Sequence, residues 1–109
     1  MPMHLPRPIE IYFDSDKAQD TEALATCFAA DATVLDEGRT FEGLAAIKAW
    51  RVGAKRKFAY TVEPLEAVQR DGKTVVTASV SGNFPGSPVS LAFVFELKHD
   101  RIASLEIRP

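Results

Sequence analysis

The first third of the chain carries apolar residues at helical spacing. Ile9, Tyr12 and Phe13 fall at positions i, i+3 and i+4, which form one face of a helix, so the pattern predicts a helix over residues 9–17. Proline occupies three of the eight preceding positions and disfavours helix there. Residues 1–8 are therefore expected to form an extended arm.

A second helix is predicted next, and short strands follow it. Asp20 is placed to accept a hydrogen bond from the first free amides of this helix. The helix has Cys27 on its apolar side and is expected to end near Ala30. Short strands are predicted at residues 32–36 and 40–42.

Gly43 opens a third predicted helix. Leu44, Ile47 and Trp50 keep helical spacing on its apolar side. Its remaining face is basic, and the basic run 55–57 is interpreted as a solvated helix end, where cations suit the helix dipole. The basic residues of this helix are Lys48, Arg51, Lys55, Arg56 and Lys57.

The second half of the chain changes to the alternation that is typical of strands. Four strands are predicted, at residues 58–70, 73–84, 89–98 and 101–108. A change of phase near Pro64 indicates a bulge, and the pair Asp71-Gly72 is a strong hairpin signal. Helices followed by antiparallel strands predict the α+β class, and 109 residues suffice for one domain, over residues 1–109.

Composition excludes several classes of function. A formal net charge of -2 argues against a large nucleic-acid-binding surface. Cys27 is the only cysteine and is expected to be a buried apolar residue. His4 and His99 lack partners at metal-ligand spacing, so neither a metal nor another cofactor is expected. The chain has no apolar run of signal-peptide or membrane-span length, which predicts a cytoplasmic protein without a membrane partner.

A motif runs from the second predicted helix into the third. It reads Phe28-Ala29-Ala30-Asp31-Ala32-Thr33-Val34-Leu35-Asp36, then Phe41-Glu42-Gly43, Ala45-Ala46-Ile47 and Trp50. This run resembles the SnoaL-like domains of the nuclear transport factor 2-like superfamily, and the order of elements extends the resemblance over nearly the whole chain. The resemblance implies a cone-shaped barrel, in which a curved antiparallel sheet and three N-terminal helices enclose a central pocket.

Within that superfamily the motif is most similar to ketosteroid isomerase, the steroid delta-isomerase. The resemblance implies that Asp36 is a general base and that Tyr12 donates a hydrogen bond to the reacting oxygen. The second donor of that family, a protonated aspartate on a late strand, corresponds to a position near Leu91, which has no proton to donate. From the residues alone, Asp36 also suits a turn, and Tyr12 also suits an ordinary core.

Two functions therefore stay open. One is a cofactor-independent isomerase or cyclase that acts on a hydrophobic carbonyl compound. The other is a non-catalytic module that binds a small apolar ligand or a protein partner. In both, the pocket is expected to be lined by Phe28, Val34, Trp50, Phe58, Tyr60, Leu91 and Phe93.

Apolar residues on both faces of the predicted sheet suggest that its outer face is covered. A homodimer through the sheets would cover that face. The residues expected opposite the pocket are Val76, Ala78, Val80, Val94, Leu105 and Ile107.

Overall fold

The computed structural model describes residues 4–57 and 59–109. Phe58, expected in the pocket, lies outside the described residues. The helical elements are α1 (Arg7–Ala18), the 3-10 turn η1 (Thr21–Ala23), α2 (Leu24–Cys27) and α3 (Leu44–Lys57). The strands are β1 (Phe28–Asp36), β2 (Arg39–Glu42), β3 (Tyr60–Arg70), β4 (Lys73–Gly82), β5 (Val89–Lys98) and β6 (Arg101–Arg108).

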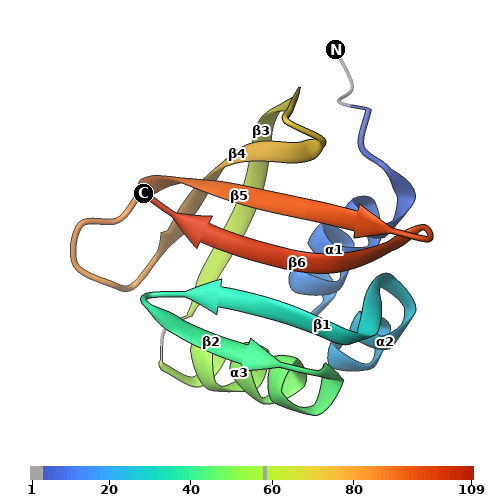
Figure 1. Ribbon diagram of the computed structural model, residues 1–109. Coiled ribbons are helices and arrows are strands. Elements are labelled where there is room, and N and C mark those ends of the chain that lie inside the picture. Colours follow the sequence, from blue (N-terminus) through green and yellow to red (C-terminus); the bar gives the residue numbers. More distant parts are fainter. Residues whose placement is uncertain (1–3, 58) are drawn as a thin grey trace.

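The strands form one curved, open sheet in the order β2-β1-β6-β5-β4-β3 (Figure 1). All neighbours are antiparallel except β1 and β6, which are parallel. The predicted sheet was wholly antiparallel. The difference arises because α3 carries the chain from β2 to the far edge at β3, and the meander β3–β6 then returns beside β1 in the same direction. The α+β cone itself is confirmed.

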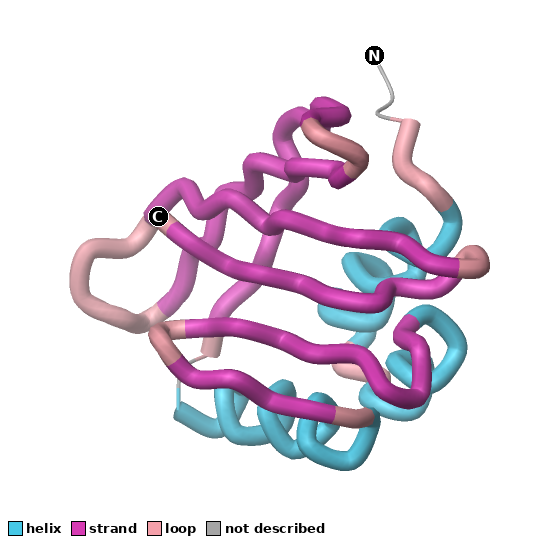
Figure 2. The backbone as a smooth tube through the Cα atoms, viewed as in Figure 1, coloured by secondary structure: helices cyan, strands magenta, loops and turns pink. Residues whose placement is uncertain are grey.

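The helices pack on one side of the sheet, behind it in the view of Figure 1. The core lies between them and the concave face, where Ile9, Phe28, Phe95 and Leu105 are almost completely buried. The predicted stripe of α1 is confirmed, since Tyr12 and its apolar neighbours on that face are all buried. The loop 83–88, which joins β4 to β5, projects at the end of the sheet (Figure 2).

The N-terminal helix begins earlier than predicted. It starts at Arg7, with Pro6 as its N-cap and Pro8 in its first turn. Proline is tolerated there because the first amides of a helix have no partner within the helix. Arg7 and Pro8, which were expected in the extended arm, therefore belong to the helix. The cap predicted at Asp20 is present, since its Oδ1 accepts a hydrogen bond from the Ala23 amide at 3.3 Å.

The second helix is shorter than predicted. It ends at Cys27, and Phe28 already belongs to β1, so the end expected near Ala30 was wrong. Phe28 pairs with Ile102 of β6, and the carbonyl of Ala32 accepts a hydrogen bond from the Gly43 amide at 2.8 Å. Pairing with a neighbouring strand overrides the local helical preference of the alanines.

The predicted turns of the second half are confirmed. Asp71 and Gly72 both have positive φ, 53° and 77°, as the two-residue hairpin turn requires. The register between β3 and β4 shifts between Pro64 and Glu66, where the change of phase indicated a bulge.

The inner and outer faces of the sheet are the reverse of the prediction at five of six positions. Val76, Ala78, Val80 and Leu105 pack in the core, and Ile107 lines the cavity described below. Of the six residues, only Val94 belongs neither to the core cluster nor to the cavity wall. The error arose because β4 carries valine at both phases of the alternation, so its burial cannot be assigned from that strand alone.

Within the described residues, no helix is long and apolar enough to cross a membrane.

Candidate functional site

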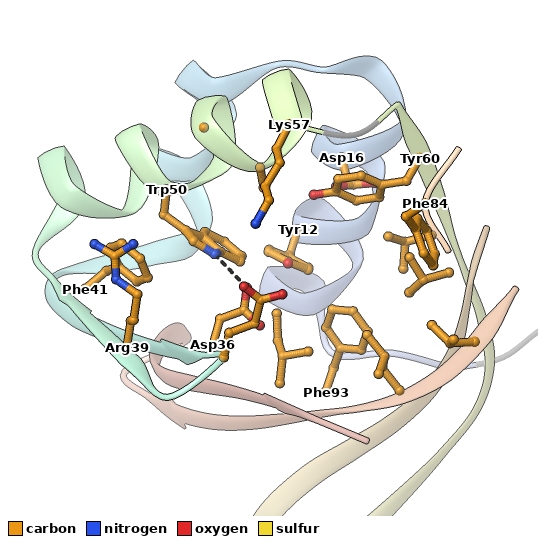
Figure 3. A pocket seen from close by; sticks show the side chains of 18 of the residues that line it. Tyr12, Asp16, Asp36, Arg39, Phe41, Trp50, Lys57, Tyr60, Phe84 and Phe93 are labelled. Carbon is orange, nitrogen blue, oxygen red and sulfur yellow. Dashed lines mark hydrogen bonds between the residues drawn. The ribbon is translucent and has the colours of Figure 1, made fainter. Parts of the chain in front are cut away.

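A cavity of about 850 Å³ lies between the concave face of the sheet, α1 and α3 (Figure 3). The predicted site residues that line it are Tyr12, Asp36, Trp50, Tyr60, Leu91 and Phe93. Phe28 and Val34, which were also expected there, are fully buried in the core and are not part of the cavity wall. The loop 83–88 contributes Phe84 and Pro85 to the wall.

Asp36 is placed by the end of β1. The next two residues, Glu37 and Gly38, have φ of 52° and 75°, so they form a tight hairpin turn that sets Asp36 opposite Arg39. The Asp36 carboxylate points into the cavity, and the indole Nε1 of Trp50 donates a hydrogen bond to its Oδ2 at 3.0 Å (Figure 3). One carboxylate oxygen is therefore oriented by α3.

The environment of Asp36 favours its protonated form. Burial raises the pKa of the carboxyl above its ordinary value, and the hydrogen bond from Trp50 opposes this rise. The neighbouring charge of Glu37 adds to it. A carboxylate with a raised pKa is a stronger proton acceptor than an ordinary aspartate.

Tyr12 brings a hydroxyl into the same cavity from α1. Its side chain is 3% exposed, and its ring meets Phe13, Phe28 and Phe95 edge-on at centroid distances of 5.1, 5.9 and 5.5 Å. Burial raises the pKa of Tyr12, and the Arg51 guanidinium opposes that rise. The hydroxyl therefore keeps its proton at neutral pH.

A buried ion cluster stands behind the cavity wall. Asp16 Oδ1 lies 3.6 Å from Arg51 Nε. Asp16 Oδ2 lies 3.2 Å from Lys55 Nζ, which also donates to the Tyr60 carbonyl at 2.9 Å. The three charged side chains are 5%, 2% and 14% exposed. Among the described residues, Arg51 Nη2 has no hydrogen-bond partner.

Sequence reasoning missed this cluster. Arg51 and Lys55 were expected on a solvated face, but α1 presents a carboxylate that draws both inward. The available signal was Asp16, which follows Tyr12 by four residues and therefore shares the buried face of α1. Burial of the Tyr60 side chain raises its pKa to about 12, and the charge of Asp16 adds to this rise.

The cavity is also more polar than predicted. Asp16, Glu37, Arg39 and Lys57 belong to its lining besides Asp36. Cys27 is fully buried away from it, as expected for a core residue, and burial raises its pKa to about 11. In the part of the chain that the structure describes, no group of three His, Cys, Asp or Glu side chains is arranged to hold a metal ion.

Comparison with known proteins identifies the family to which the chain belongs. Residues 9–105 match the SnoaL-like domain. The chain belongs to the SnoaL-like family. Its fold is that of the nuclear transport factor 2-like superfamily. None of the curated proteins compared with the chain matches it.

Solved structures agree with this assignment. A proposed polyketide cyclase from Sinorhizobium meliloti is 49% identical, with a TM-score of 0.92 and 95% of each chain covered. A Catenulispora acidiphila protein of ketosteroid isomerase-like fold, in complex with trimethylamine, is 21% identical, with a TM-score of 0.82 and coverage of 97% of this chain and 87% of that one. A proposed SnoaL-like isomerase from Agrobacterium tumefaciens is 16% identical, with a TM-score of 0.75 and coverage of 93% and 92%.

The ion cluster predicts an asymmetry in stability. Asp16→Ala leaves two buried cations without their carboxylate and should lower the free energy of unfolding by about 3–5 kcal/mol. Arg51→Met should cost clearly less, because Asp16 keeps Lys55 and the unpartnered Nη2 is removed. Urea denaturation of both variants measures the difference. If both variants lost the same free energy of unfolding, the interpretation of the cluster as two cations that share one carboxylate would be wrong.

Proposed function

We propose that this protein is a cofactor-independent isomerase or cyclase that acts on a hydrophobic carbonyl compound, with Asp36 as general base and Tyr12 as hydrogen-bond donor. The observation that carries the proposal is the cavity they share, in which a carboxylate of raised pKa lies near a protonated, buried hydroxyl. A base and an oxyanion donor in one partly desolvated site are the requirements for enolate chemistry.

The reaction begins with Asp36. Its carboxylate takes a proton from the carbon next to the carbonyl group, and the electrons of that C–H bond pass through the new C=C bond to the carbonyl oxygen. Tyr12 donates a hydrogen bond to this oxygen as its negative charge develops. An isomerase then returns the proton from Asp36 to a different carbon. In a cyclase, the enolate carbon attacks a second carbonyl group and closes a ring.

Trp50 supports this role of Asp36 without touching the reacting atoms. Its indole holds Oδ2 at 3.0 Å and so leaves Oδ1 to face the substrate. The proposed polyketide cyclase at 49% identity supports the choice of reaction, because ring closure and isomerisation share the first proton transfer.

A non-catalytic ligand-binding or protein-interaction module is the alternative. Leu91 favours it, since this cavity residue offers no donor for a developing oxyanion. The first prediction below separates the two functions.

We also propose that the protein forms a homodimer through its sheet. One row of paired residues crosses five strands on the outer face: Leu35, Glu106, Val94, Val75 and Val68. Leu35 and Val68 are 36% and 47% exposed. A second copy that packs on this row would remove its apolar side chains from water.

Asp36→Asn should lower the rate of α-proton exchange by about 10²–10⁴-fold, because the amide cannot accept the proton. Tyr12→Phe should lower it by about 10²–10³-fold. Deuterium exchange into 2-tetralone, a bicyclic ketone, followed by NMR, measures both rates. Asp31→Asn, at an exposed position of the same strand, is the matched control. An Asp36→Asn variant that binds the ketone and exchanges its protons at the wild-type rate would establish the binding module instead.

The exchange rate should fall at low pH, as Asp36 becomes protonated. Because its pKa is raised, the midpoint of this fall should lie above the ordinary value of 3.8. Trp50→Phe removes the hydrogen bond that opposes the rise, so the midpoint should move to still higher pH. Phe41→Leu changes a ring neighbour of Trp50, at a centroid distance of 6.3 Å, and should leave the midpoint in place. A midpoint that does not move in Trp50→Phe argues against Asp36 as the base.

Sedimentation should give twice the chain mass of 12.0 kDa for the wild type. Val68→Glu puts a charge into the proposed interface and should give the mass of one chain, with the fold intact. Val52→Glu changes a valine that is similarly exposed, at 37%, but lies on α3. It should remain dimeric. A wild type that sediments at monomer mass would refute the dimer.

A further inference from the structure

The proposed reaction moves a full negative charge onto the carbonyl oxygen of the substrate. A neutral donor such as Tyr12 stabilises that charge only in part. Asp16 and Glu37, which also line the cavity, add negative charge that opposes it, and Leu91 contributes no polar side-chain atom. Electrostatic stabilisation of the developing charge is commonly the largest contribution to such catalysis. A cation that faces the position of this oxygen would supply further stabilisation.

Lys57 meets this requirement. It is the last residue of α3 and lines the cavity. Figure 3 shows its amino group directed into the cavity, toward the space between Trp50, Asp36 and Tyr12. Its side chain enters from the exposed end of the helix, so a substrate that fills the cavity would meet both its amino group and the Tyr12 hydroxyl.

The wall behind Tyr12 adds positive charge in the same region. The buried cluster holds two cations, Arg51 and Lys55, against the single carboxylate of Asp16. The Arg51 guanidinium carbon lies 5.1 Å from the centroid of the Tyr12 ring, and its Nη2 has no partner among the described residues. With Lys57 this end of the cavity has an excess of positive charge. A buried or half-buried excess of one sign favours a ligand of the opposite sign.

We propose that Lys57 and Tyr12 together form an anion-binding site for the enolate oxygen, so that the pocket selects ligands that are enolates or their stable analogues, the phenolates. The inference rests on the proposed function, and it adds a second catalytic group to it. Lys57 contributes positive charge and takes no part in the proton transfer. After the proton transfer Asp36 is neutral and the negative charge is on the substrate oxygen. The proton transfer moves the negative charge from the carboxylate to the oxygen that Lys57 and Tyr12 hold, so the cation stabilises the product of this step more than its starting state.

A phenol whose ionised form is coloured tests the site directly. The probe is 4-nitrophenol, and the protein is the Asp36→Asn variant, whose neutral amide resembles the protonated base of the intermediate. Titration of the bound probe gives the ratio of phenolate to phenol in the site. Adding Lys57→Met should lower this ratio about tenfold at a fixed pH, since a nearby cation favours the anionic form by roughly one pKa unit or more.

Two further variants, each made in the same Asp36→Asn protein, serve as controls. Arg56→Met removes a cation from the neighbouring position, which does not line the cavity, and should leave the ratio unchanged. Lys57→Arg keeps the charge and should retain most of the ratio measured in the Asp36→Asn protein. Glu37, Arg39 and Asp16 are the same in all of these proteins, so their charges cancel from the comparison.

Equal ratios in the Lys57→Met and Arg56→Met proteins would overturn the proposal. Failure of the Asp36→Asn protein to bind the probe would overturn it as well, because a paired hydroxyl and ammonium should hold a phenolate. Neither result bears on Asp36 as a base, which the deuterium-exchange assay decides separately. Conversely, loss of the base mechanism would leave the phenolate measurement intact as a property of the pocket.

Discussion

The parallel pairing of β1 with β6 is the constraint on which the cavity depends. It joins two units that are each local in sequence: the helices with the β1–β2 hairpin, and the meander β3–β6. The register sets Val34 beside Leu105 and Asp36 beside Ile107. Asp36 therefore opens onto the same concave surface as Phe93 of β5. A shift of this register by one residue would turn the Asp36 carboxylate to the outer face of the sheet.

The second organising feature is the separation of charge along the cavity. Asp36 and Glu37 lie at one end, where Arg39 offsets part of their charge. The cations Arg51 and Lys55 lie behind Tyr12, and the Lys57 amino group points toward the space between Trp50, Asp36 and Tyr12 (Figure 3). The buried charges of Asp16, Arg51 and Lys55 are costly, because each loses hydration. Apolar residues of similar volume at these positions would often be at least as stabilising, so the cluster is not explained by stability alone.

Most of the fold could be predicted because its signals are local. Alternation, the Asp71-Gly72 turn and the stripe of Tyr12 each depend on a few neighbouring residues. The errors came where partners distant in sequence decide the outcome. The end of α2 depends on pairing with β6, and the burial of Arg51 depends on Asp16 in another helix. The position of Asp36 was accessible through the family motif, whereas its contact with Trp50 required the three-dimensional structure.

The hydrogen bond between Trp50 and Asp36 also makes the site observable. Trp50 is the only tryptophan of the chain, and its indole nitrogen contacts the proposed base at 3.0 Å. Indole emission depends on nearby charge and on contact with water. A change in the charge of Asp36 or in the hydration around it should therefore alter the tryptophan fluorescence of the protein. The chain thus carries an intrinsic fluorophore at the proposed site. Ligand entry and proton uptake by Asp36 can be followed in the unmodified protein, in real time and without a label.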